Sequence, residues 1–104
     1  LLAEAAQKGL IGGSPQAYYT AGIKASLEFN EIDSAEAAAY LASNVGILAT
    51  DQTLALQQIG NEKWKAVFTQ GIEAWTEQRR TGYPILTPAI EGNINEIPSR
   101  LTYP

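Results

Sequence analysis

The chain has 104 residues, of which 45% are hydrophobic and 17% charged, a composition typical of one ordinary globular domain with a modest core. The net charge of −4 disfavours nucleic acid as a partner, because phosphate binding needs a basic patch and none is visible. The absence of histidine and cysteine excludes serine–histidine and cysteine–histidine catalysis by these residues, as well as disulfide bonds between them. No apolar run approaches the roughly 20 residues that a membrane-spanning helix needs.

The first 31 residues predict a helical hairpin. Residues 1–9 are rich in alanine and lack proline, as at the end of a helix, and the glycines of residues 10–13 then allow a turn. Ser14 and Pro15 predict the start of a second helix, as cap and first-turn proline, and this helix continues to about Phe29. Its apolar face consists of Tyr18, Tyr19, Ile23 and Leu27. Such a hairpin is the unit of tetratricopeptide-like repeats, although one unit does not define an array.

A short third helix is predicted over residues 35–43, AEAAAYLAS. Asp33, with Glu36 three residues later, or Ser34 can cap its start. Asn44 and Gly46 are suited to its end. Residues 47–49 then form a short apolar link to the next helix.

Residues 51–82 predict one long helix, which would contain both tryptophans. Asp51 or the preceding threonine can cap its start, and Gly82 followed by Pro84 is typical of its end. The expected apolar face consists of Leu56, Ile59, Trp64, Val67, Phe68, Ile72 and Trp75. A helix this long would extend about 45 Å, and glycine is unfavourable inside it, so we expect a kink or a break near Gly71.

Residues 83–104 differ from the rest because prolines divide them into short extended pieces. We expect this tail to lie over the helices rather than to form a sheet. Its expected anchors are Tyr83, Ile85, Leu86, Ile90, Ile97 and Leu101.

The best candidate for metal binding or acid–base chemistry is the pair Glu73 and Glu77, which lie one helical turn apart. Two such carboxylates could hold a hard cation such as calcium, or act as acid and base on a sugar. The favoured interpretation is structural, with these side chains either solvated or paired with neighbours such as Arg80.

Trp64 and Trp75 could stack on sugar rings. They lie about three helical turns apart on the expected apolar face, so a position in the core is the favoured interpretation. Arg79 and Arg80 could bind an acidic ligand, but their position favours a role at the helix C-terminus or pairing with a buried carboxylate. We therefore expect the sequence RRTGYP, residues 79–84, to be a structural lock between the long helix and the tail.

Several spaced pieces carry a family resemblance. They are Lys63-Trp64, GIEAW at residues 71–75, Glu77, RRTGYP at residues 79–84 and IPSRLTYP at residues 97–104. In this order they resemble the C-terminal part of the SusD/RagB family, especially its SusD-like branch. The earlier AEAAQKGL and SPQAYYTAGIKASLEF are similar to the helix pair that precedes this part. The resemblance covers nearly all of this chain but only the last portion of the family's length.

The resemblance implies a non-catalytic nutrient-binding lipoprotein on the outer surface of Bacteroidetes. Such a protein captures a nutrient, often an oligosaccharide, and delivers it to a SusC-like TonB-dependent transporter in the outer membrane. The family's lipid-modified N-terminal cysteine is not among these residues. None of its ligand-binding residues matches a position here, so no catalytic, cofactor, metal or ligand residue is assigned, and no cofactor is expected.

The predicted fold is all-α: a tetratricopeptide-like hairpin (residues 1–31), a short helix and a long kinked helix (33–82), and an extended tail (83–104). Because the chain opens within a helical pattern and lacks methionine, we expect it to be a fragment, and the resemblance implies that it is the C-terminal part of a longer SusD-like chain. Such a fragment should expose apolar surface where the rest of the chain docked. The alternative function is a helical-repeat module that binds a protein partner through the groove of its hairpin.

Overall fold

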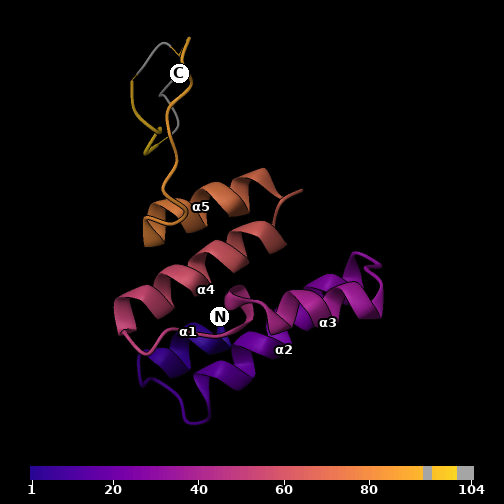
Figure 1. The fold of residues 1–104 in the computed structure, drawn as a ribbon. Coiled ribbons are helices and arrows are strands. Elements are labelled where there is room, and N and C mark those ends of the chain that lie inside the picture. The colour runs from indigo at the N-terminus through magenta and orange to yellow at the C-terminus, as the bar shows by residue number, and fades with distance from the viewer. Residues whose placement is uncertain (93–94, 101–104) are drawn as a thin grey trace.

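The computed structural model describes residues 1–92 and 95–100, and within them the fold is helical with no strand, as predicted. The elements are α1 (Leu2–Gln7), α2 (Pro15–Phe29), α3 (Ser34–Ala42), a 3-10 turn η1 (Asn44–Gly46), α4 (Gln52–Ala66) and α5 (Gly71–Thr81). Figure 1 shows α5 lying along α4, with α1 and α2 on the other side of α4. None of these helices is long and apolar enough to cross a membrane.

The predicted hairpin is confirmed. The Ser14 side chain accepts a hydrogen bond from the amide of Ala17, and Pro15 occupies the first turn of α2. Tyr19 and Ile23 point from α2 into the core, where they join residues from α1 and α4. The buried core cluster consists of Ala3, Tyr19, Ile23 and Ile59, with Tyr18 and Leu27 among the half-buried residues packed against it. The helical spacing of the α2 apolar face therefore identified the core side of this helix correctly.

Asp33 is the residue that caps α3, since its carboxylate accepts from the amide of Ala35 at 2.8 Å. After α3, two glutamine side chains hold the link to α4. Gln16 donates to the carbonyl of Gly46 and accepts from the amide of Leu48, both at 2.8 Å. Gln58 makes the matching pair of hydrogen bonds one residue further along, at 2.9 and 2.7 Å. The link thus satisfies its backbone through side chains from α2 and α4, as an irregular segment against a core must.

The kink expected near Gly71 is a complete break. Helix α4 ends at Ala66, residues 67–70 form a turn, and α5 begins at Gly71. The two ends match the prediction, with Asp51 accepting from the amide of Leu54 at 2.9 Å and Gly82 in the left-handed conformation at φ 77°. The break lets α5 fold back beside α4, which one straight helix could not do (Figure 1).

The predicted apolar face of the long helix is therefore only partly correct. Ile59 is buried, but the side chains of Phe68 and Ile72 are 80% and 71% exposed. Helical spacing places residues on one face only while the helix continues, and the turn at residues 67–70 interrupts it. The return of α5 beside α4 also leaves little space at Gly60, where a Cβ would make a tight contact of 3.2 Å with the Cβ of Tyr83.

The prediction that the tail lies over the helices is wrong for three of the five expected anchors that lie within the described residues. Ile85, Leu86 and Ile90 are exposed because this part of the tail extends away from the helices (Figure 1), although the tail returns to α5 at Pro98, whose carbonyl accepts a hydrogen bond from Trp75. Tyr83 and Ile97 are half-buried. The remaining expected anchor, Leu101, lies outside the described residues.

Candidate functional site

An apolar groove of about 930 Å³ lies between α1, α2 and the C-terminal half of α4, and a smaller cavity lies near η1. The floor of the groove includes the core residues Tyr19, Ile23 and Ile59, while Leu1 and Phe68 are highly exposed at its edge. Soluble proteins seldom expose continuous apolar surface without a function for it. We refer to this cavity as the apolar groove.

The smaller cavity, called the small hollow below, has a volume of about 410 Å³. It lies between η1, the face of α4 that carries Trp64, and the start of the tail at Pro84. Its lining is formed by Tyr19, Asn44, Val45, Gln58, Asn61, Glu62, Trp64, Lys65 and Pro84. The volume falls in the roughly 300–1,000 Å³ range of small-molecule sites.

Glu62 and Lys65 line both cavities and belong to a polar cluster with Tyr40 from α3. The Tyr40 hydroxyl donates to Glu62 at 2.9 Å, and the Lys65 ammonium donates to the Tyr40 hydroxyl at 3.1 Å and also to Glu62. Burial opposes the charge on Lys65, but its hydrogen bonds to Glu62 and Tyr40 leave its pKa above the ordinary value. We call these three residues the Tyr40 cluster.

A second charged cluster ties α1, α4 and α5 together. Arg80 donates to both carboxylate oxygens of Glu4, each at 2.7 Å, and to Glu77 at 2.8 Å. Lys63 donates to the other oxygen of Glu77, and Lys8 donates to Glu4 at 2.6 Å. The bidentate Arg80–Glu4 contact joins residues 76 positions apart, so it fixes the tertiary position of α5. We call Glu4, Lys63, Glu77 and Arg80 the Arg80 cluster.

The Arg80 cluster shifts the protonation of its acids. The hydrogen bond from Arg80 is the largest influence on Glu4 and, although burial opposes it, lowers the pKa of Glu4 to about 2. Burial is the largest single influence on Glu77, but hydrogen bonds from Arg80 and Lys63 together still leave the pKa of Glu77 below its ordinary value. Both carboxylates are therefore ionised at neutral pH, which suits ion pairing and leaves neither as a proton donor.

Comparison with known proteins places this arrangement in a family. The model of a SusD-like family, described as "Starch-binding associating with outer membrane", matches residues 1–104. The chain belongs to this SusD-like family. A solved structure described as "Bacteroidetes AC2a SusD-like" is 30% identical to it, with a TM-score of 0.88 over 98% of this chain. The SusD-like chain spans 22% of the length of that structure, and no match was found among curated proteins.

Glu73 and Glu77 do not form a joint site in this SusD-like chain. Glu77 is buried and binds Lys63 and Arg80, whereas Glu73 is exposed and has no charged partner in the described part of the chain. The structural interpretation of the pair is confirmed, because one residue is solvated and the other pairs with Arg80. The engaged oxygens of Glu77 leave little capacity to coordinate a cation.

Neither tryptophan is buried in the core, so the favoured interpretation of Trp64 and Trp75 is wrong. Both are half-buried, because they lie on opposite sides of the break at residues 67–70. Trp75 donates to the carbonyl of Pro98 at 2.7 Å, and the guanidinium of Arg79 lies over its ring at 4.6 Å from the centroid.

The predicted lock at residues 79–84 does not join the long helix to the tail through Arg80. Arg80 links α5 to Glu4 of α1, not to the tail, whereas the Thr81 hydroxyl accepts from the amide of Tyr83 at 3.1 Å and holds the turn. Glu4 was not predicted as a partner of Arg80, because the two residues lie 76 positions apart in the sequence. Asn61 of the small hollow was also missed, although it lies three residues from Trp64 and hence on the same side of one helix.

Proposed function

We propose that this SusD-like chain belongs to a non-catalytic protein of the cell surface that captures an oligosaccharide. In this proposal the protein is an outward-facing lipoprotein that delivers its ligand to a SusC-like TonB-dependent transporter. The observation that carries the proposal is the family match over residues 1–104, because the family is described as starch-binding and associated with the outer membrane. An enzymatic function is disfavoured because the chain has no histidine or cysteine and because Glu77 is already paired.

We also propose that these residues form the C-terminal, helical portion of a longer SusD-like protein. The proposal is supported by the coverage of only 22% of the AC2a structure. It is also supported by the apolar groove, whose exposed edge at Leu1, Leu2 and Phe68 suits contact with a further part of the same protein. The helices would then serve mainly as scaffold.

The test uses the natural full-length protein and two probes that differ in their linkage, a maltooligosaccharide and a cellooligosaccharide of equal length. Isothermal titration calorimetry should detect binding of at least one of them, with the starch-derived maltooligosaccharide expected to bind more tightly. Purification from membranes should recover the SusC-like transporter with the protein. Absence of binding to both probes, together with absence of the transporter, would overturn the proposed function.

The alternative, a helical interaction module, is favoured by one observation only, the apolar groove with its volume of about 930 Å³. It requires that a helical peptide occupy the groove. Leu2→Glu and Phe68→Glu would then abolish binding of the partner protein, and the wild-type protein would bind neither oligosaccharide. Nutrient capture predicts instead that the wild-type protein binds an oligosaccharide.

A further inference from the structure

The polar groups that line the small hollow divide into those already bonded and those available. The Tyr19 hydroxyl donates to the carbonyl of Val45 at 2.8 Å, and both ends of the Gln58 amide bind the link to α4. Glu62 is occupied by the Tyr40 cluster. These residues therefore act as a fixed wall, which positions the remaining groups without competing for a ligand.

Two amides in the hollow remain unengaged. Within the described residues, the side chains of Asn44 and Asn61 form no hydrogen bond, and the Asn61 Oδ1 atom is buried without a donor. An unsatisfied buried acceptor is unfavourable and is uncommon in native proteins. An amide can both donate and accept, so these two residues suit a ligand whose groups also do both, such as a hydroxyl-rich molecule.

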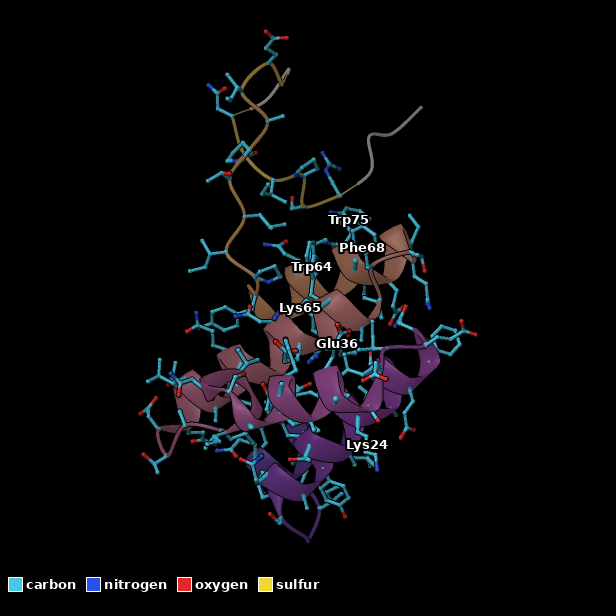
Figure 2. All side chains as sticks on the ribbon, turned by 45° about the vertical axis from the view of Figure 1, so that its right-hand side comes forward. Lys24, Glu36, Trp64, Lys65, Phe68 and Trp75 are labelled. Atoms are coloured by element: carbon cyan, nitrogen blue, oxygen red, sulfur yellow. The ribbon has the colours of Figure 1, made fainter. Side chains whose placement is uncertain are left out.

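Trp64 supplies the apolar side of the same hollow, together with Pro84. Its indole N–H donates to no group in the part of the chain that the structure describes, and no cation covers its ring. Trp75 differs in both respects, because its N–H binds Pro98 and Arg79 covers its ring. Figure 2 places Trp64 beside Lys65 on α4 and Trp75 beyond it on α5. Only Trp64 thus combines an available N–H with an uncovered ring next to a cavity.

We propose that the small hollow is a binding subsite for one neutral pyranose ring of an oligosaccharide. The ring's C–H face would lie against Trp64 and its hydroxyls would bond to Asn61 and Asn44, which follows the usual division of ligand sites into apolar contact and a few polar groups. The ligand is neutral because Lys65 and Glu62 already pair with each other, so the hollow presents no uncompensated charge. This subsite rests on the proposed function and specifies where on this chain one sugar ring would bind.

The test measures binding of the same maltooligosaccharide to the natural full-length protein and to three variants. Asn61→Leu preserves the size of the side chain and removes an unpaired acceptor, so folding is expected to be retained. Trp64→Ala removes the stacking surface. Trp75→Ala is the matched control, because it deletes a tryptophan that is also half-buried but lies outside the hollow. Thermal melting of each variant establishes that it is folded.

The proposal predicts about a ten-fold increase in the Kd of the saccharide for Asn61→Leu, which corresponds to the loss of one or two hydrogen bonds to the sugar. For Trp64→Ala it predicts an increase in Kd at least as large. Trp75→Ala should bind like wild type. If the wild-type protein binds the saccharide and both hollow variants bind it equally well, the subsite is wrong and the proposed function stands. If the wild-type protein binds neither this probe nor the cellooligosaccharide, both proposals fall. Equal weakening by Trp75→Ala and Trp64→Ala would also overturn the subsite, because the effect would not be specific to the hollow.

Discussion

The two charged clusters of this SusD-like chain both involve helix α4, yet they differ in what they hold together. The Arg80 cluster joins α1, α4 and α5, and its central acid, Glu77, has a side chain that is only 6% exposed. The Tyr40 cluster joins only α3 and α4, and the side chain of its Lys65 is 55% exposed. Lys63 and Lys65 are two residues apart in sequence but support different parts of the fold. From this comparison we expect the contribution of a charged cluster to folding stability to depend on how many carboxylates one cation binds and on how deeply they are buried, rather than on the number of charges.

The largest expected effect comes from Arg80→Ala. This variant removes the partner that Glu4 and Glu77 share, and leaves Glu77 buried with Lys63 alone. Breaking a buried pair costs about 3–5 kcal/mol, and the partial exposure of Arg80 lowers the expected loss of unfolding free energy to about 2–3 kcal/mol. Urea unfolding of the natural protein, monitored by circular dichroism, measures it.

Arg79→Ala is the matched control for that measurement. It deletes the same type of side chain one residue earlier, but the guanidinium of Arg79 only lies over the ring of Trp75. Such a contact contributes roughly 0.5–1 kcal/mol at an exposed site. Equal destabilisation by the two variants would show that Arg80 does not hold α5 to α1, and the contrast between the clusters would lose its basis.

An intermediate effect is expected from acid, and the direction follows from Glu4. Its pKa is about 2 in the folded protein and near 4.5 in an unfolded chain, so the ion pair stabilises the fold fully above pH 4.5. That contribution is lost progressively as the pH falls from about 4.5 to 2. Solvent screening at Arg80 limits it to about 1–2 kcal/mol.

Glu4→Gln tests this origin of the acid sensitivity. The variant should be less stable than wild type at pH 7 and should lose less stability between pH 5 and pH 2.5, so the two curves approach each other in acid. Unfolding midpoints in urea at a series of pH values measure the difference. Parallel curves would mean that the acid sensitivity comes from other carboxylates. The first of these to test is Glu77, whose pKa is also lowered, by means of the variant Glu77→Gln.

The two clusters also show why sequence predicted some of the fold and little of the site. The start of α2 and the end of α5 at Gly82 depend on residues within one turn and were predicted, and the cap of α3 was narrowed to Asp33 or Ser34, of which the structure shows Asp33. The apolar face of α2 was predictable because the helix is uninterrupted. The pairing of Arg80 with Glu4 spans 76 positions and leaves no periodic signal, so only the folded chain reveals it.

The tryptophans illustrate a second limit. Their spacing of eleven residues indicates a shared face only if the helix between them is continuous, and the turn at residues 67–70 makes that assumption fail. Gly71 predicted a kink or a break in the helix, but it did not show that the helix would be divided completely. Ile85 and Ile90 show the same limit in the tail, since hydrophobicity alone indicated burial but no neighbouring element provides a surface for them in the described residues.

The smallest expected effect is that of Tyr40→Phe in the second cluster. The variant removes the hydroxyl that donates to Glu62 and accepts from Lys65, but these two charged groups remain paired with each other. A hydrogen bond of this kind contributes about 0.5–1.5 kcal/mol, and the value here should be near the lower limit because Lys65 can be hydrated instead. Urea unfolding under the conditions used for Arg80→Ala makes the comparison direct. A loss as large as that of Arg80→Ala would mean that the hydroxyl between α3 and α4 is as important as the guanidinium that joins α5 to α1. Stability would then follow the polar contacts around the two cavities rather than the number of carboxylates that one cation serves.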